Sequence, residues 1–368
     1  MRVAVIGAGA MGAATSWRLA KRGVEVVCYD RYSPPHALGS THGESRIIRT
    51  AYFEGPWYVP LVKEAFQLWR ELESETGAEL LTMTGALMIG APDSEAVTGA
   101  MESARTHGLD VELLDPDELR RRYRGHVVRD DQVAVLDKQA GILRPEAAVT
   151  AMLSQAPGVV RDTRVGSVAD LVDSFDAVVV AAGPWTPELV DWIPLQVERQ
   201  VHVWFELEAR VDWLAPERFP VFILQSGEFG DVYGIPSLDG VSMKVGRHHE
   251  GEFTDPHSIR RVVDETDVDP LRRMAATHLR GLTGRATRTL TCMYTNTPDR
   301  HFVIDFSPGD RRVVVISACS GHGFKFAPVI GDIAADLLCD GATRRDISRF
   351  AAARFATSHV PDDHDDRD

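Results

Sequence analysis

The chain has 368 residues, of which 44% are hydrophobic and 26% are charged, as in an ordinary globular protein. That length exceeds the usual size of one hydrophobic core, so we expect two domains or one large domain with an insertion. Its 54 acidic residues outnumber the 40 basic ones, and the net charge of −14 argues against nucleic acids and anionic membranes as partners.

The first thirty residues predict a strand, a helix and a second strand. The apolar run 2–6 is typical of a strand, residues 11–22 predict a helix closed by Gly23, and residues 24–29 predict another strand ending on Asp30. The turn between the first strand and the helix has the spacing G-x-G-x-x-G, formed by Gly7, Gly9 and Gly12. This βαβ pattern predicts a dinucleotide site.

Each residue of that motif has a physical purpose. Gly7 allows the tight turn, Gly9 lets a pyrophosphate approach the backbone at the helix N-terminus, and Gly12 lets the helix pack on the strand. Asp30 follows about 20 residues later, where a carboxylate binds ribose hydroxyls. Because a carboxylate would repel a 2′-phosphate, NADP is disfavoured. The motif does not distinguish FAD from NAD.

Two later apolar runs, residues 176–182 and 312–318, have the length of fully buried parallel strands. Each leads into a glycine turn, and after the second turn residues 328–338 predict a helix. The middle of the chain predicts antiparallel strands separated by polar helices. These strands are 86–89, 201–207, 232–235, 242–246 and 287–294, and the helices include 93–107 and 256–264.

This order predicts a discontinuous nucleotide-binding domain, made of residues 1–85, 140–200 and 290–358. A β-rich substrate domain would comprise residues 86–139 and 201–289, and the Asp-rich tail 359–368 is predicted to be disordered. No apolar run approaches the ~20 residues of a membrane span. The four cysteines lie far apart without a C-x-x-C pair, which predicts a cytoplasmic protein without a disulfide framework or structural zinc.

Three further segments resemble the monomeric sarcosine oxidase and N-methyltryptophan oxidase family, FAD-dependent amine oxidases of the D-amino-acid oxidase superfamily. They are residues 34–49 (PPHALGSTHGESRIIR), 292–299 (CMYTNTPD) and 320–326 (SGHGFKF). With the N-terminus they span nearly the whole chain in the family's order. The resemblance implies a mixed α/β (α+β) fold, in which a glutathione-reductase-type FAD-binding domain carries an inserted antiparallel β-sheet substrate domain.

The resemblance also implies an activity, the oxidation of secondary amino acids such as sarcosine, N-methyltryptophan or pipecolate. A hydride would pass from the carbon next to nitrogen to FAD N5, the imine would be released and hydrolysed, and O2 would reoxidise the flavin, giving H2O2. The expected partners are therefore a small amino-acid substrate and O2, and we expect a monomer.

Several residues match the family's flavin contacts. Cys292 resembles the cysteine that carries FAD through a thioether to the flavin 8-methyl group. Strand alternation places Leu290, Cys292 and Tyr294 on one face, although a lone cysteine is commonly a small buried hydrophobe. The other matching positions are His42 and Arg46 near the flavin ring, Gly183 and Trp185 at a strand-to-turn contact, and Gly321 and Gly323 in the turn against the flavin.

Other residues match the family's catalytic positions. Lys244 resembles the lysine that activates oxygen, because a fixed cation stabilises the charge of superoxide. Its alternative is the solvated face of an edge strand. Arg49 and Lys325 resemble the pair that holds the substrate carboxylate, where their positive field would favour the neutral amine; surface salt bridges are the alternative. The substrate-pocket positions are matched by Tyr233, His248 and Tyr294, whose tyrosines could equally be core aromatics.

The segment 222–231 matches the family poorly, and Leu224 falls where some sarcosine oxidases carry methionine, so the side-chain specificity is open. Alternative functions are a flavin-dependent amino acid dehydrogenase, a biosynthetic imine-forming oxidase with another acceptor or a bulkier substrate, an NAD-dependent dehydrogenase, and a non-catalytic flavin-binding subunit. Lys244 argues against the first, and Cys292 would have no purpose in an NAD enzyme.

Overall fold

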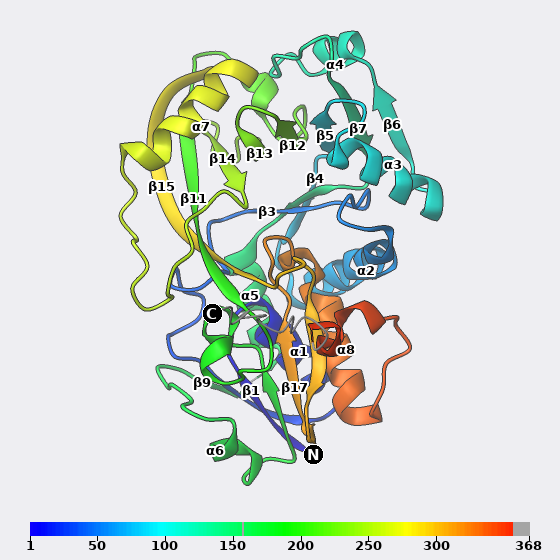
Figure 1. The fold of residues 1–368 in the computed structure, drawn as a ribbon, viewed down its shortest axis with the longest axis vertical. Coiled ribbons are helices and arrows are strands. Elements are labelled where there is room, and N and C mark those ends of the chain that lie inside the picture. Colours follow the sequence, from blue (N-terminus) through cyan, green and yellow to red (C-terminus); the bar gives the residue numbers. More distant parts are fainter. Residues whose placement is uncertain (157, 356–368) are drawn as a thin grey trace, which may run out of the picture.

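The structure, a computed structural model, describes residues 1–156 and 158–355, so the predicted tail 359–368 lies outside the described residues. Three sheets organise this part of the chain. Figure 1 shows a six-stranded sheet in the half that contains the N-terminus and an eight-stranded sheet in the other half, with a three-stranded sheet between them. The fold is the mixed α/β type that the sequence predicts.

The six-stranded sheet has the order β16-β17-β10-β1-β2-β9. Its strands are β1 (Arg2–Ile6), β2 (Glu25–Tyr29), β9 (Val159–Val160), β10 (Ala177–Val180), β16 (Val303–Ser307) and β17 (Asp310–Ser317). All neighbours pair in parallel except β16 and β17. Val3 and Val5 face one core with the helices α1, α5 and α8, whereas Ala4 and Ile6 face a second core. Burial on both faces explains the continuous apolar runs.

Helices cover one face of this sheet. They are α1 (Ala10–Lys21), α5 (Pro145–Ser154) and α8 (Ala327–Asp340), and α2 (Val59–Thr76) packs beside α8. The close crossing of α1 and α8 depends on Gly331, where an added Cβ would lie 2.5 Å from the carbonyl carbon of Ala14. None of the helices in the described ranges is long and apolar enough to cross a membrane.

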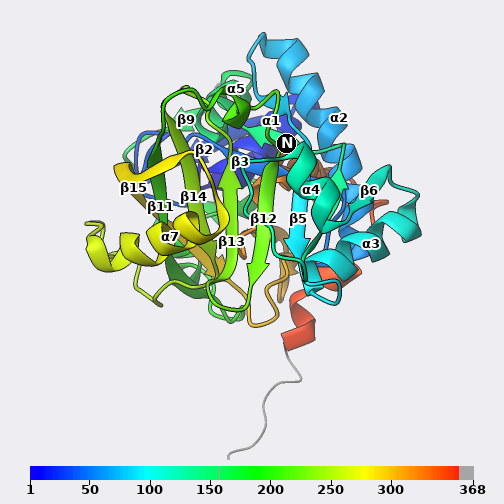
Figure 2. The same ribbon diagram turned by 90° about the horizontal axis from the view of Figure 1, so that it is seen from above.

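The eight-stranded sheet has the order β15-β11-β14-β13-β12-β5-β7-β6. Its strands are β5 (Ala86–Gly90), β6 (Val111–Leu114), β7 (Val133–Asp137), β11 (Gln196–Leu207), β12 (Val221–Ser226), β13 (Gly230–Ile235), β14 (Ser242–His248) and β15 (Leu282–Asn296). All neighbours are antiparallel except β5 and β12, a parallel pair. The helices α3 (Glu95–His107), α4 (Pro116–Arg122) and α7 (Glu265–His278) cover this sheet, with α7 lying across its strands in Figure 2.

Two long strands connect the halves of the molecule. β11 and β15 pair along most of their length and run from the eight-stranded sheet towards the six-stranded one (Figure 1). The three-stranded sheet of β3 (Arg46–Ile48), β8 (Gly141–Leu143) and β4 (Leu81–Met83) lies between the two larger sheets. Segments far apart in the sequence therefore meet at this junction. We keep the predicted domain boundaries as a proposal.

The predicted helix 256–264 is wrong. This segment is irregular, and the helix begins only at Glu265, where Asp264 caps it by accepting a hydrogen bond from the backbone N–H of Thr266. The guanidinium of Arg199 donates to the backbone carbonyls of Arg260 and Val262, at 2.6 Å and 3.3 Å. This long-range contact holds the segment in a non-helical path, which a local pattern does not reveal.

Candidate active site

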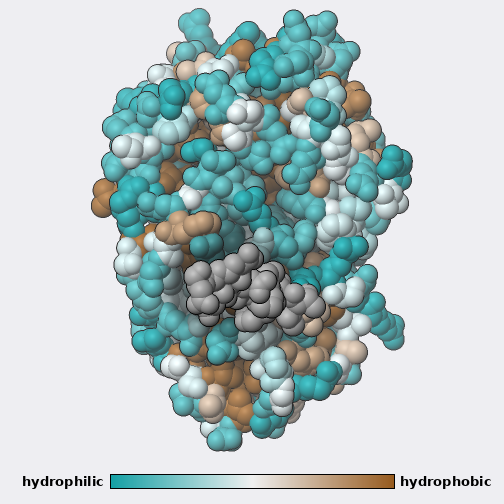
Figure 3. Space-filling view, viewed as in Figure 1, coloured by the Kyte–Doolittle hydropathy of each residue, from teal (hydrophilic) through white to brown (hydrophobic). Residues whose placement is uncertain are grey.

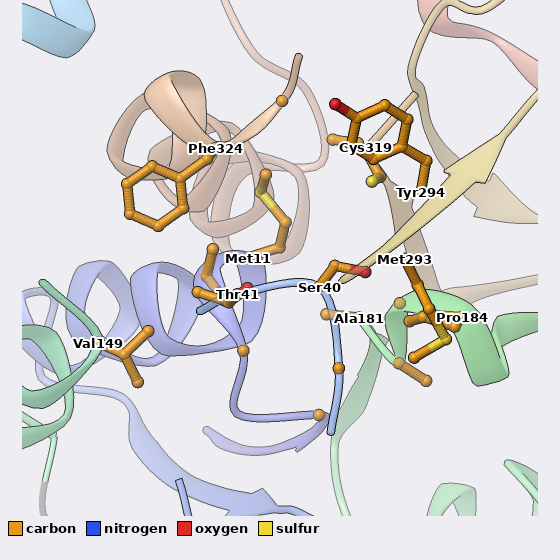
Figure 4. Close-up of a pocket in the computed structure, with 18 of the residues that line it drawn as sticks. Met11, Ser40, Thr41, Val149, Ala181, Pro184, Met293, Tyr294, Cys319 and Phe324 are labelled. Atoms are coloured by element: carbon orange, nitrogen blue, oxygen red, sulfur yellow. The ribbon is translucent and has the colours of Figure 1, made fainter. Parts of the chain in front are cut away.

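The glycine turn leaves open space at the N-terminus of α1. Gly7 has a φ of +99°, and a Cβ there would lie 2.4 Å from the carbonyl oxygen of Ala181. A Cβ at Gly12 would lie 1.7 Å from the carbonyl oxygen of Gly7, so only glycine lets α1 start this close to β1. At Gly9 the nearest atom is the Thr41 hydroxyl at 3.5 Å, beside the helix start seen in Figure 4. The turn has the shape that a pyrophosphate needs.

Asp30 lies at the wall of the same space and is buried. Its carboxylate accepts hydrogen bonds from the backbone N–H groups of Ala8 (2.7 Å) and Tyr32 (2.8 Å). Nε2 of His36 lies 3.3 Å from Oδ1, and Oδ2 keeps a second lone pair that can accept a ribose hydroxyl. The residue thus ties the glycine turn to β2 in addition to facing the cavity.

One continuous cavity extends from the glycine turn to the eight-stranded sheet. Most of the predicted site residues line it, namely Gly7, Gly9, Asp30, Arg46, Arg49, Gly183, Trp185, Tyr233, Lys244, His248, Tyr294, Gly321, Gly323 and Lys325. Figure 4 shows Ser40, Thr41 and Met11 at the helix α1, with Tyr294 beside Cys319 across the space. The part of the molecular surface that is coloured in Figure 3 is mostly hydrophilic.

Gly12, His42 and Cys292 do not line the cavity. Gly12 serves helix packing, and His42 and Cys292 are buried just behind the wall. The sulfur of Cys292 lies 3.7 Å from a guanidinium nitrogen of Arg46, which does line the cavity. The side chain of Arg46 therefore lies between Cys292 and the cavity.

The Cys292 thiol is more acidic than an ordinary one. Burial raises its pKa, but the neighbouring His42 and the positive charge of Arg46 outweigh burial and lower the pKa to about 7. Cys28 shows the opposite case, because burial and the nearby Asp30 charge raise the pKa of its thiol to about 12. A low pKa makes a thiol a better nucleophile, because more of it is present as thiolate. Cys28 therefore behaves as an inert, buried apolar residue, whereas Cys292 has the acidity of a reactive thiol.

Lys244 is buried, with 3% of its surface exposed. Its strand β14 lies between β11 and β13, which excludes the solvated edge strand. The ammonium donates to the backbone carbonyls of Gly43 (2.8 Å) and Ser45 (3.1 Å). Burial and the positive charge of Arg46 hold the pKa of Lys244 well below its usual value.

Arg49, Lys325 and Glu54 form a charged group in the wall of the cavity. Arg49 is 2% exposed and donates to the carboxylate of Glu54 and to the carbonyl of Ala51. Burial raises the pKa of Glu54, but the charges of Arg49, His322 and Lys325 lower it to about 2. Glu54 is therefore ionised, and any ligand carboxylate must compete with it for Arg49. Glu54 belongs to no sequence motif and was not predicted as a site residue.

Lys325 is buried and donates to the carbonyl of His322 (2.6 Å) and to the hydroxyl of Tyr52 (3.3 Å). Burial and the charge of Arg49 lower the pKa of Lys325 to about 7, against the opposing effect of Glu54. Neither Arg49 nor Lys325 is a surface salt bridge, which was the alternative for both. Tyr52 and His322 were also missed.

The opposite wall carries aromatic and apolar side chains. The hydroxyl of Tyr294 lies 3.2 Å from Nδ1 of His248, and Tyr233 lies in register with Ile223. Ile223 lines the cavity, whereas Leu224 packs in the core beneath α7. Alternation along β12 turns Leu224 and Ile223 to opposite faces of the sheet. His202 lines the cavity as well and was missed.

Within residues 1–156 and 158–355, no group of His, Cys, Asp and Glu is arranged to hold a metal ion.

Comparisons with known proteins match nearly the whole chain. A family model described as FAD dependent oxidoreductase matches residues 2–337. The chain is 38% identical to a monomeric sarcosine oxidase of Streptomyces avermitilis, covering 97% of this chain and 98% of the relative. It is 34% identical to an N-methyl-L-tryptophan oxidase of Yersinia pestis, covering 95% and 98%.

Solved structures share the fold. NikD, an unusual amino acid oxidase essential for nikkomycin biosynthesis, superposes with a TM-score of 0.83 at 24% identity, covering 95% of this chain and 96% of that one. An L-proline dehydrogenase from P. horikoshii gives a TM-score of 0.80 at 21% identity, covering 96% and 97%.

Proposed function

The chain belongs to the FAD dependent oxidoreductase family, and we propose that it is an oxidase of secondary amino acids, either N-methylated or cyclic. The names of its relatives support this class of substrate. The observation that carries the proposal is the convergence of Arg49, Lys325 and Lys244 on the cavity that begins at the glycine turn. We also propose a cytoplasmic monomer, and the separated free cysteines support a reducing compartment.

Bound FAD would supply the redox chemistry, taking a hydride from the carbon next to nitrogen and passing electrons to O2. The open turn at Gly9 and the buried carboxylate of Asp30 fit its ADP half. The walls formed by Arg46, Trp185 and the 321–323 turn would hold the rest. The ring nitrogen of Trp185 is buried without a partner in the described part of the chain, so it can donate to the cofactor.

Arg49 and Lys325 would hold the substrate carboxylate. Two buried cations fix a carboxylate in one orientation and so position the rest of the substrate. Glu54 occupies Arg49 in this structure, and a substrate carboxylate would take over that contact. The free amine, once formed, suits a site that already contains two cations.

We expect carboxylate binding to weaken as the pH rises through about 7. The pKa of Lys325 is lowered to about 7, so the ammonium is present below this pH and lost above it. The dissociation constant of acetate, read from the flavin absorbance of the holoenzyme between pH 6 and 9, should rise towards about tenfold per pH unit above the midpoint. The Lys325→Met variant should bind acetate weakly at all these pH values, without a midpoint near pH 7. The same midpoint in that variant would contradict the assignment of this pH dependence to Lys325.

We propose that FAD is attached covalently through Cys292, a step that the lowered thiol pKa supports. Wild-type protein should then stay yellow after acid precipitation, whereas Cys292→Ser should release its flavin into the supernatant. Cys319→Ser is the matched control, because Cys319 lines the cavity but burial raises the pKa of its thiol. Release of flavin from the wild type would contradict the covalent link and leave the oxidase proposal standing.

A peroxide-coupled screen tests the function. Sarcosine, N-methyl-L-amino acids, proline and pipecolate are offered to the holoenzyme in air, and at least one should yield H2O2. If these compounds reduce the flavin without peroxide, the protein is a dehydrogenase with another acceptor.

A further inference from the structure

A buried carboxylate lies just outside the cavity and has no place in the chemistry described so far. Glu198 on β11 is 3% exposed and accepts four hydrogen bonds. One carboxylate oxygen accepts from the backbone N–H of Gly251 (2.8 Å) and from the side-chain amide of Gln200 (2.7 Å). The other oxygen accepts from the side-chain amide of Asn296 (2.7 Å) and from Nδ1 of His249 (3.3 Å). Only an ionised carboxylate can accept from four donors.

The ionisation of Glu198 agrees with this geometry. Burial raises its pKa, but the hydrogen bonds from His249, Gly251 and Asn296 bring it below the usual value. Since Glu198 can only accept, Nδ1 of His249 must be the donor, which leaves Nε2 as the other ring nitrogen for proton exchange. A proton that reaches Nε2 makes an imidazolium whose charge Glu198 compensates.

His249 is held in a strained backbone conformation. Its φ is +59°, a left-handed value that few residues other than glycine adopt. Consecutive residues of a strand point to opposite faces, but this turn brings the ring of His249 beside that of His248, with ring centres 4.2 Å apart. The strain thus places an imidazole between the cavity histidine and Glu198.

His248 lines the cavity and contacts Tyr294. Burial and the neighbouring His249 hold the pKa of His248 well below its usual value, so its ring is neutral and returns any proton that it accepts. The other charged or titratable groups facing the two histidines are Tyr294, Asp231, Glu54, His322 and Lys325. Glu250, next along the chain, is exposed to solvent.

We propose that His249 and Glu198 form a proton relay that carries the ammonium proton of the bound substrate from His248 to solvent. The proposal rests on the amine oxidation proposed above, because an amino acid arrives as an ammonium ion and only the free amine gives up a hydride. The substrate N–H bond breaks, its electron pair stays on nitrogen, and the proton passes to His248, to Nε2 of His249 and then to water. No electron is transferred in this step.

The test follows the proton and the flavin separately in anaerobic stopped-flow mixing of the holoenzyme with a reducing N-methyl amino acid. A pH-indicator dye in weak buffer reports proton release, and flavin absorbance reports reduction. His249→Asn keeps a residue that tolerates the left-handed backbone but cannot titrate. His249→Gly also keeps the backbone and leaves room for free imidazole. Glu250→Gln is the matched control, since it removes an exposed carboxylate next to His249.

We expect both His249 variants to release the proton about tenfold more slowly at neutral pH, a modest share of what a proton-transfer group contributes. The deficit should vanish at high pH, where the free amine enters, and added imidazole should restore His249→Gly but not His249→Asn. Glu250→Gln should match the wild type. Unchanged proton release in the His249 variants, or a loss that neither imidazole nor pH relieves, would overturn the relay. A wild-type flavin that no secondary amino acid reduces would overturn the proposed function and the relay with it.

Discussion

Lys244→Met should slow the reoxidation of the reduced holoenzyme by O2 about 100- to 1000-fold, the usual cost of removing one group that stabilises developing charge. Superoxide forms when the first electron reaches O2, and a buried cation stabilises that anion strongly because little water screens it. Lys244 is placed for this role, since it is 3% exposed and its amine donates to the carbonyls of Gly43 and Ser45. These two acceptors favour the ammonium form and oppose burial and the Arg46 charge, which lower the pKa of Lys244. Methionine keeps the length of the side chain and removes the charge.

The two half-reactions are measured apart in a stopped-flow instrument. Substrate reduction of the flavin in Lys244→Met should stay within a few-fold of the wild type, while mixing the reduced enzyme with aerated buffer reveals the slow reoxidation. Lys325→Met is the matched control, because Lys325 is the other buried lysine of the cavity and should show the reverse pattern. Equal slowing of both half-reactions in Lys244→Met would contradict the role of this lysine in oxygen activation.

Arg49→Met should lower the efficiency of flavin reduction by substrate by about 100-fold or more, the scale expected when one partner of a buried charge pair is removed. The substrate loses its guanidinium contact, and the carboxylate of Glu54, whose side chain is 15% exposed, loses its main counter-ion. That carboxylate would repel the incoming substrate carboxylate. The ratio of the limiting reduction rate to the dissociation constant measures the effect.

The double variant Arg49→Met, Glu54→Gln separates these two causes. It should recover part of the loss, because the unpaired carboxylate is gone, but it should not regain the wild-type preference for carboxylate-bearing substrates. A simple N-methyl alkylamine, which has no carboxylate, should be affected far less by Arg49→Met than an N-methyl amino acid. Equal losses for both substrates would contradict the carboxylate contact.

Local patterns predicted the nucleotide half well. The glycine spacing and the apolar runs are short-range features, and steric limits at Gly7 and Gly12 leave few other structures for them. The segment 256–264 failed because the guanidinium of Arg199, about sixty positions earlier, takes its carbonyls.

The charged partners of the site were the hardest part to predict. Arg49 and Lys325 were identified through family motifs, but Glu54 pairs with Arg49 only because the chain folds back after β3. Glu198 and His249 are distant in sequence, and the left-handed turn that joins them to His248 has no signal in the residue pattern. Such contacts are set by tertiary structure rather than by local spacing.

Anaerobic titration followed by exposure to air tests the central claim most directly. The holoenzyme is mixed under argon with the amino acid that responds best in the peroxide screen, and its flavin absorbance is followed. A secondary amino-acid oxidase should bleach completely, then recover its colour in air with one H2O2 formed per flavin. A flavin that no secondary amino acid bleaches, or that bleaches but yields no peroxide on reoxidation, would contradict the assignment as an amino-acid oxidase.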